Sequence, residues 1–464
     1  MESRKSFGGS LGFVLAAAGS AVGLGNIWRF PYLAAKDGGG MFLLVYFILL
    51  LTFGFALLTT EIAIGRMTKQ SPLTAYGRIS KNWKGLGLIA CLIPAIIMPY
   101  YSAIGGWVVK YFVAFLSGSD AQAAQDGFFT GFITAQYEPL VYMFLFLIAC
   151  TTIILLGVNK GIEASSKIIM PALILLVIII AAFSLNISHT DANGVTRTGM
   201  EGLKIYLIPN LEGLTFSSFM TVLVDAMGQL FFSLSVAMGI MVAYGSYVSD
   251  KADAVSSVNR IEFFDTLVAF LAGLMIIPAV FTFMGTEGLT ASGPGLMFIS
   301  LPKVFESMGG AGVFIGVLFF LMVLFAAITS AVSIMEAIVS SFMDYFHITR
   351  VKATLAEFFI ALVFGTIVCL GYNVLYFELP MPTGGTGQVL DLMDYLSNNI
   401  LMPLISIGTC LMIGWFVGPE IIIKEMEKNG EKFSRRYIYI AMIKYIAPAL
   451  LILLFLKSSG IVSF

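Results

Sequence analysis

The chain has 464 residues, of which 58% are hydrophobic and only 11% are charged, and its mean hydropathy is +0.94. Soluble domains carry about 25% charged residues, so this composition excludes a soluble protein and indicates one embedded in a membrane. Lys and Arg total 26 against 27 Asp and Glu, which gives a net charge of −1. The chain therefore lacks the basic surface that a nucleic-acid-binding protein needs.

Cysteine and histidine are too few and too scattered to build a metal or catalytic cluster. The four cysteines lie inside apolar stretches without metal-ligand spacing, at Cys91, Cys150, Cys369 and Cys410. Neither a disulfide framework nor a zinc site is expected from them. The two histidines, His189 and His347, are far apart in the sequence. A membrane enzyme built on a histidine cluster or a catalytic triad is therefore disfavoured.

Eleven apolar stretches are long enough to cross a membrane, since a span needs about 20 residues. They are centred in 11–34, 41–64, 86–115, 140–157, 164–185, 221–247, 262–284, 312–342, 354–372, 389–416 and 438–456. The basic start, MESRKSFGG, is followed by no small-residue cleavage pattern, so we expect it to be retained. The sequence thus predicts an all-α integral membrane protein with about 11 transmembrane helices, forming one domain over residues 1–464.

Basic residues alternate from loop to loop. Arg4 and Lys5 precede the first span, and the second, fourth, sixth, eighth and tenth loops all carry Lys or Arg, most densely in 424–436. The loop 117–139 carries none. Because short basic loops stay in the cytoplasm, the N-terminus is predicted to be cytoplasmic and the protein to cross the cell membrane many times.

Helix-breaking residues interrupt the first and the sixth span. The first reads GSAVGLGNIWRFP over 19–31, and the sixth reads FFSLSVAMGIMVAYGSY over 231–247. If the first ten spans form two repeats of five, spans one and six are the first span of each repeat. Because each repeat has an odd number of spans, the second repeat enters the membrane with the opposite orientation. Secondary transporters use this plan and bind their substrate where the two broken helices meet. We predict a first repeat over 8–186, a second over 215–417, and a peripheral eleventh helix over 437–457.

Two simpler interpretations of the first interruption compete with this one. Gly19 and Gly23 form a GxxxG pattern, which more often marks a helix-packing face. Packing does not explain Asn26 and Arg29 beside them, because polar groups at membrane depth are costly and are usually functional. A dinucleotide-binding loop is excluded because the third glycine and the flanking strand are missing.

The stretch 19–31 resembles the first-segment signature of the neurotransmitter:sodium symporter family. Six further stretches resemble family patterns in the same order: DGGG at 37–40, EIAIGR at 61–66, KGIE at 160–163, GQLFFSLS at 228–235, AAITSAVSIME at 326–336 and LDLMDY at 390–395. The resemblance covers essentially the whole chain. Many members have twelve spans, so this chain is similar to the bacterial eleven-span amino-acid transporters. It implies a symporter that drives an amino acid or amine uphill with sodium.

The resemblance also implies two sodium ions and their ligands. The first sodium site maps onto Ala21, Asn26, Ser233 and Asp265, and the second onto Gly19, Val22, Ala326, Thr329 and Ser330. A desolvated cation needs several oxygen ligands, and backbone carbonyls are available only where a helix unwinds. For Thr329 and Ser330 the alternative is a hydrogen bond back to their own helix.

Asp265 departs from the asparagine that many relatives place here. A fixed carboxylate stabilises sodium in a low dielectric far more than a neutral amide does. It also supplies the negative charge that chloride provides in chloride-dependent members, and the family's chloride-region position four residues on is Ala269. We therefore expect no chloride requirement. An open alternative is that Asp265 titrates and carries a proton outward.

The implied substrate site combines residues from four spans. It maps onto Ser20, Ala21, Gly25, Ile97, Tyr101, Phe232, Ser233, Ser235, Met238, Ser330, Ser333 and Ile334. Amine-carrying relatives place an aspartate at Gly23, so its absence favours a substrate that brings its own carboxylate, held by a helix N-terminus and by sodium. The apolar wall favours a hydrophobic L-amino acid, aromatic ones included, and Met238 is adaptable. Another small zwitterion or an amine is the alternative.

Charged residues at both ends of the pathway resemble the family's gates. On the outer side Arg29 is expected to pair with Asp394 over a lid of Tyr101 and Phe232. On the inner side the corresponding residues are Arg4 and Asp344, with Tyr247 nearby. Alternate formation of the two pairs gives alternating access. Three other acids inside spans are expected to be protonated or hydrogen-bonded: Glu61, Asp225 and Glu336.

Three other classes of protein were weighed against a symporter. A channel also uses rings of carbonyls and hydroxyls, but paired gates and breaks at corresponding positions argue against it. An enzyme is disfavoured because no nucleophile has a plausible base partner. A receptor that only binds needs no second gate. The residues leave open the oligomeric state and the identity of the amino acid.

Overall fold

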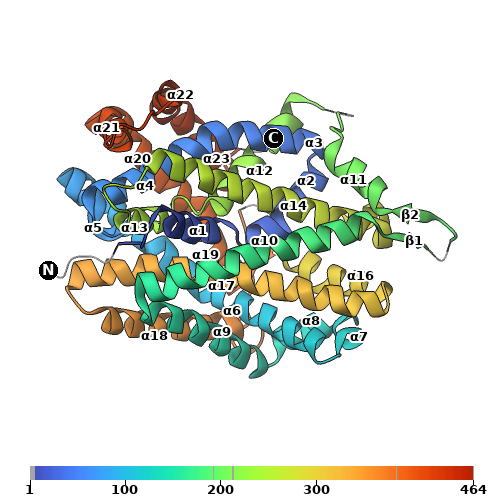
Figure 1. Cartoon of the computed structure of the whole chain (residues 1–464). Coiled ribbons are helices and arrows are strands. Elements are labelled where there is room, and N and C mark those ends of the chain that lie inside the picture. Colours follow the sequence, from blue (N-terminus) through green and yellow to red (C-terminus); the bar gives the residue numbers. More distant parts are fainter. Residues whose placement is uncertain (1–5, 192, 212–213, 383, 463–464) are drawn as a thin grey trace.

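The computed structural model describes residues 6–191, 193–211, 214–382 and 384–462. Within these ranges ten helices are long and apolar enough to cross a membrane, and a bent helix pair at the N-terminal end makes eleven. Two short antiparallel ribbons are the strand structure of the described chain. The predicted all-α membrane architecture is therefore confirmed (Figure 1).

The first five spans are continuous helices except for local π-helical turns (η) and one break. The first span consists of α1 (Ser10–Ala21), η1 (Gly25–Arg29) and α2 (Phe30–Lys36); the second of α3 (Gly40–Leu49), η2 (Leu50–Gly54) and α4 (Phe55–Thr68); the third of α6 (Lys84–Leu116); the fourth of α9 (Glu138–Leu155); and the fifth of η4 (Val158–Glu163) and α10 (Ala164–Leu185).

The next six spans begin with the second broken one. The sixth span consists of α12 (Phe216–Ser233) and α13 (Ile240–Ser246); the seventh of α14 (Ala254–Gly288); the eighth of α17 (Gly310–Phe346); the ninth of α18 (Arg350–Leu370); the tenth of α19 (Val389–Asp394), η6 (Tyr395–Leu401), α20 (Met402–Leu411) and η7 (Met412–Val417); and the eleventh of α22 (Arg436–Ala441), η8 (Met442–Ile446) and α23 (Ala447–Ser458).

Short elements fill the loops. On the inner side these are α5 (Pro72–Ile79), the 3₁₀ turn η3 (Lys81–Trp83) and α21 (Glu420–Met426). On the outer side they are α7 (Asp120–Ala123), α8 (Phe128–Thr134), β1 (Ser188–Thr190), β2 (Thr196–Thr198), α11 (Gly199–Leu207), α15 (Gly293–Gly295), η5 (Leu296–Ser300), α16 (Leu301–Ser307), β3 (Leu379–Pro380) and β4 (Thr386–Gly387). In β1–β2, His189 pairs with Arg197, and in β3–β4, Leu379 pairs with Gly387.

Both predicted breaks are present. The axes on the two sides of the first break differ by 52°. In the sixth span the helix stops at Ser233 and resumes at Ile240, and three residues between them have left-handed backbone angles, with φ of 51° at Ser235, 65° at Ala237 and 71° at Gly239. Glycine adopts this conformation without cost, whereas Ser and Ala do so at some strain, which is typical of functional sites.

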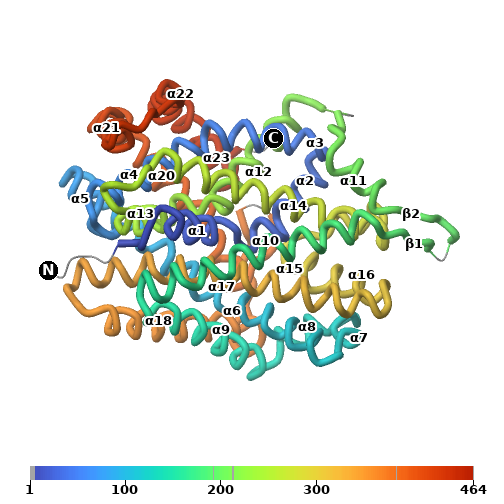
Figure 2. The backbone as a smooth tube through the Cα atoms, viewed as in Figure 1, coloured from blue at the N-terminus to red at the C-terminus, as the bar shows by residue number. Residues whose placement is uncertain are grey.

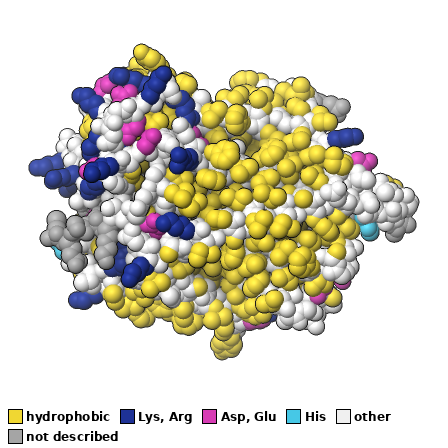
Figure 3. Space-filling view, viewed as in Figure 1, with side chains coloured by type: hydrophobic (Ala, Val, Ile, Leu, Met, Phe, Trp, Pro, Cys, Tyr) yellow, Lys and Arg dark blue, Asp and Glu magenta, His cyan; other side chains and the backbone are white. Residues whose placement is uncertain are grey.

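The broken spans lie in the middle of the bundle. Helix α1 packs against α10, α14 and α17, while α12 packs against η1, α2 and α3 (Figure 2). Hydrophobic side chains cover most of the middle of the face seen in Figure 3, and most Lys and Arg side chains visible there gather at the end from which the chain starts. By the positive-inside rule this end is cytoplasmic, as the loop charges predict.

Candidate functional site

Asp265 of α14 is the centre of a buried hydrogen-bond cluster at the first break. Asn26 Nδ2 donates to Asp265 Oδ1 at 2.8 Å, and Ser233 Oγ lies 2.7 and 2.8 Å from the two carboxylate oxygens. Asn26 Nδ2 also lies 3.1 Å from Ser233 Oγ. All three residues are completely buried. The structure therefore brings together three of the four residues mapped to the first sodium site.

Tyr46 belongs to the same cluster, although sequence reasoning missed it. Its hydroxyl lies 3.0 Å from Ser233 Oγ and 3.4 Å from Asp265 Oδ2. Tyr46 is on α3 and is held by Phe30 and Phe42, whose ring centroids lie 4.9 and 5.9 Å from its own. The signal in the sequence is weak, because one tyrosine in a span usually lies at the membrane interface or in the core.

The second set of mapped ligands lies where α1 approaches α17. The last carbonyls of a helix have no partner within it, and Ser20 O accepts hydrogen bonds from Ser235 Oγ at 2.9 Å and from Ser330 Oγ at 3.0 Å. A Cβ at Gly19 would lie 3.4 Å from Thr329 Cβ, so the two helices are in close contact there. Thr329 Oγ1 bonds to Phe325 O and Ala326 O of its own helix, the alternative considered above.

The donor chemistry of both clusters suits a hard monovalent cation. Carboxylate, amide, hydroxyl and carbonyl oxygens are the ligands that such ions prefer. Among the described residues, no group of three or more His, Cys, Asp or Glu side chains could hold a metal ion. The clusters therefore fit sodium better than a transition metal or zinc.

A small cavity of about 20 Å³ lies between the two breaks. It is lined by Ser20, Gly23, Leu24, Gly25, Ile97, Tyr101, Phe232, Ser235, Met238, Ile240, Ser330 and Ile334. Most of the predicted substrate residues are thus gathered around one space. Its wall is apolar on one side and carries serine hydroxyls on the other.

Some predicted residues lie outside this lining, and three lining residues, Gly23, Leu24 and Ile240, are not in the predicted set. Ala21 is buried outside the lining and Ser233 bonds Asp265, while Ser333 Oγ bonds Thr329 O at 2.8 Å and Tyr244 OH at 2.7 Å. Leu24 and Ile240 line the cavity instead. Both directly follow a break, and the direction of a side chain there depends on backbone angles that helical periodicity does not give.

Gly23 and Gly25 are required by close packing around the cavity. A Cβ at Gly23 would lie 2.7 Å from Ser330 Oγ, and one at Gly25 would lie 3.2 Å from a ring carbon of Phe232. A larger residue at either position would displace the neighbouring side chain. The cavity beside Gly23 therefore has no room for an acidic side chain at this position.

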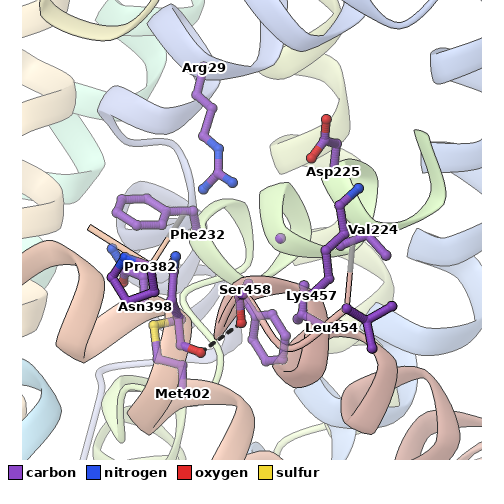
Figure 4. A pocket seen from close by; sticks show the side chains of 15 residues that line it. Arg29, Val224, Asp225, Phe232, Pro382, Asn398, Met402, Leu454, Lys457 and Ser458 are labelled. Atoms are coloured by element: carbon purple, nitrogen blue, oxygen red, sulfur yellow. Dashed lines mark hydrogen bonds between the residues drawn. The ribbon is translucent and has the colours of Figure 1, made fainter. Parts of the chain in front are cut away.

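An outer vestibule of about 400 Å³ lies above Phe232, whose ring borders both spaces (Figure 4). The Arg29 guanidinium points into the vestibule and lies 5.9 Å from the centre of the Phe232 ring. Among the described residues Arg29 forms no ion pair with Asp394, which instead accepts a hydrogen bond from Asn398 Nδ2 at 2.5 Å. The eleventh span also reaches this space, through Leu454, Lys457 and Ser458.

The inner end is closed by the start of the chain. Phe7 N donates to Tyr247 O at 3.1 Å, and Gly8 N donates to Glu163 Oε2 at 2.8 Å. Asp344 Oδ2 accepts a hydrogen bond from Ser71 N at 2.7 Å. Arg4, its expected partner, lies outside the described residues. An outer vestibule is thus present, while the described start of the chain packs against the inner side.

The three other acids inside spans are hydrogen-bonded, as expected. Glu61 Oε1 accepts from Ala237 N at 2.6 Å and so ties the second span to the unwound part of the sixth. Glu336 pairs with Arg350 at 2.7 Å and accepts from Tyr247 OH at 2.6 Å. Asp225 pairs with Lys36 at 2.7 Å. These carboxylates join helices on either side of the pathway.

Asp37 lies beside the vestibule, just after the first span. Its side chain is only 5% exposed, and Lys36 Nζ is 3.8 Å from Oδ1. Burial, together with the neighbouring charge of Asp225 and against the attraction of Lys36 and Lys457, raises the pKa of Asp37 to about 7. The folded protein therefore favours the neutral form of this carboxyl group.

This shift makes stability depend on pH. A raised carboxyl pKa contributes stability at low pH that is lost as the pH rises from the ordinary carboxyl range through about 7. Asp37→Asn has no carboxyl group to ionise, so the variant does not lose this stability as the pH rises. The Tm of Asp37→Asn minus the Tm of the wild type should therefore be about 2 °C larger at about pH 8 than at about pH 5. Thermal unfolding in detergent at both pH values tests this. The exposed Asp126→Asn serves as control, and an equal shift at both pH values would contradict the prediction.

Comparisons with known proteins give the same family over nearly the full length. The model of the "Sodium:neurotransmitter symporter family" matches residues 4–123 and 133–463. The uncharacterized sodium-dependent transporter YhdH of Bacillus subtilis is 34% identical over 462 residues, covering 98% of this chain and 97% of the relative. The rat sodium- and chloride-dependent taurine transporter is 27% identical, covering 91% of this chain and 73% of the relative.

A solved structure agrees with these sequences. The crystal structure of MhsT in complex with L-phenylalanine matches with a TM-score of 0.85 and 33% identity, covering 98% of this chain and all of that one. The family consists of transporters rather than enzymes. The chain is therefore a multi-pass, sodium-dependent transporter of the membrane, and it belongs to the sodium:neurotransmitter symporter family.

Proposed function

We propose that this chain imports a hydrophobic L-amino acid, driven by two sodium ions and without a chloride requirement. The observation that carries the proposal is the Asp265 cluster with Asn26 and Ser233, which lies next to a small apolar cavity lined by the serines of both broken spans. A carboxylate on the substrate would approach the sodium bound at Asp265, which makes the binding of the two mutually dependent.

The chemistry of the residues that line the cavity supports this substrate class. Ile97, Phe232, Met238 and Ile334 form an apolar wall suited to a hydrocarbon side chain. The close approach of Ser330 to Gly23 leaves no room for the acidic side chain that would pair with a substrate amine. MhsT was crystallised with L-phenylalanine, which is consistent with a hydrophobic substrate for a related fold.

Asp265 is also the basis for expecting chloride independence. Its carboxylate accepts the donors of Asn26, Ser233 and Tyr46, so a fixed negative charge lies where the positive charge of sodium needs compensation. The cluster consists of four side chains, those of Asn26, Tyr46, Ser233 and Asp265, and Asp265 is the acid among them. Among the described residues, no Lys or Arg side chain lies within hydrogen-bond distance of its carboxylate. A mobile anion would add a second negative charge to a buried site.

Alternating access follows from the two ends of the pathway. In this conformation the inner side is closed by Phe7, Gly8 and Tyr247, while Arg29 and Asp394 are apart on the outer side. We infer that substrate and sodium binding draw Arg29 toward Asp394 over Phe232, and that the inner contacts then open.

Competition uptake tests the substrate. Purified protein in liposomes should take up a radiolabelled mixture of the standard amino acids only when sodium is outside. Unlabelled leucine, isoleucine, methionine or an aromatic amino acid should compete, whereas aspartate and lysine should not. If no hydrophobic amino acid competes but another zwitterion such as taurine does, the pocket assignment is wrong and the alternative substrate class holds.

A further inference from the structure

A group of four charges joins three spans at the rim of the outer vestibule. We call it the rim cluster; it consists of Lys36, Asp37, Asp225 and Lys457. Lys36 Nζ lies 2.7 Å from Asp225 Oδ2 and 3.8 Å from Asp37 Oδ1. Lys457 extends from α23 toward Asp225 (Figure 4). Two carboxylates thus share two ammonium groups.

The gate arginine lies against the same face of α12 as Asp225. Arg29 approaches Gly228, where a Cβ would lie 3.1 Å from its Nη2, and it approaches the Phe232 ring. Positions 225, 228 and 232 fall on one face of a helix. Asp225 is therefore one turn from the point where Arg29 packs, and both side chains line the vestibule.

Asp225 is consequently a competitor for Arg29. A guanidinium forms strong charge-assisted hydrogen bonds with any accessible carboxylate. An unneutralised Asp225 would therefore compete with Asp394 for the guanidinium of Arg29. The short contact with Lys36 removes most of this attraction.

We propose that Lys36 is a positioning residue of the outer gate, which neutralises Asp225 and thereby leaves Asp394 as the closing partner of Arg29. The inference rests on the proposed Arg29–Asp394 gate. The short contact with Asp225 is made by Lys36, whose Nζ lies 2.7 Å from Oδ2, while Lys457 reaches the same cluster from α23. Without Lys36, Asp225 loses its partner at 2.7 Å and draws Arg29 to the open side.

Transport of a radiolabelled mixture of the standard amino acids tests the effect on gating. Lys36→Gln should lower the initial uptake rate about 10-fold, corresponding to about 1.4 kcal/mol, and the Lys36→Gln/Asp225→Asn double variant should recover most of it. Lys303→Gln removes an outer lysine that pairs with Asp126 away from the vestibule and serves as the matched control. An unchanged rate in Lys36→Gln, or no recovery in the double variant, would overturn the inference.

A second measurement does not depend on the substrate. In the wild-type background, the effects of Arg29→Gln and Asp225→Asn on Tm should be additive, because these side chains do not pair. In the Lys36→Gln background they should become non-additive by about 2 °C, because Arg29 and Asp225 then pair. Additivity in both backgrounds would overturn the inference even if uptake changes. If the wild type takes up no amino acid while the coupling appears as expected, the proposed function fails and the role of Lys36 stands.

Discussion

Asn26→Leu is expected to abolish sodium-dependent uptake while leaving the protein folded. Asn26 is completely buried, and its amide group donates to both Asp265 and Ser233. Leucine has the same number and branching of heavy atoms but no polar atom, so the carboxylate loses one partner and sodium loses an oxygen ligand. We expect the sodium concentration that gives half-maximal uptake to rise at least about 100-fold, on the order of 3 kcal/mol.

Two measurements separate a lost site from a lost fold. The rise in Tm that sodium causes in the wild type should vanish in Asn26→Leu, since a ligand stabilises only a fold that binds it. Thr282→Val is the matched control, because Thr282 is equally buried and its hydroxyl bonds only to Pro278 O of its own helix. Wild-type sodium dependence in Asn26→Leu would remove Asn26 from the site.

Asp265→Asn should weaken sodium binding by 10- to 100-fold, on the order of 1.4 to 2.8 kcal/mol, because an amide carries no net charge. The geometry is conserved, since the Asn oxygen in the place of Oδ1 accepts from Asn26 Nδ2 and Ser233 Oγ, while the new amide group faces the Tyr46 hydroxyl, which can accept. The expected readout is a shift in the sodium dependence of uptake with little change in Tm in the absence of sodium.

The same variant tests the charge argument for chloride. Uptake by the wild type should be unchanged when chloride is replaced by gluconate on both sides. Asp265→Asn should remain impaired in gluconate at every sodium concentration that saturates the wild type. Chloride-dependent uptake by the wild type would show that the carboxylate of Asp265 does not supply the compensating charge.

Much of the fold is predictable from the sequence. Span number and orientation follow from the length of apolar stretches and from the loop charges, both of which act locally along the chain. The breaks follow from Gly, Ser and Asn in the middle of otherwise apolar spans, because the backbone groups that they release need polar partners at membrane depth. Family motifs then place Asn26, Ser233 and Asp265 in one cluster, and the structure brings them together.

The remainder depends on contacts between spans. Tyr46 joins the Asp265 cluster only because α3 packs beside α12, and one tyrosine carries no periodic signal. Leu24 and Ile240 line the cavity because of backbone angles at the breaks. The pairing of Lys36 with Asp225 joins residues 189 positions apart. Loop charge rules assign such residues a side of the membrane but no partner.

Accumulation against a gradient tests the central claim most directly. Proteoliposomes loaded with potassium and diluted into sodium should accumulate a radiolabelled hydrophobic amino acid above its outside concentration. Adding a sodium ionophore should release it, and replacing chloride should change nothing. Uptake that only equilibrates, or that proceeds equally well with sodium absent on both sides, would contradict a sodium-coupled symporter.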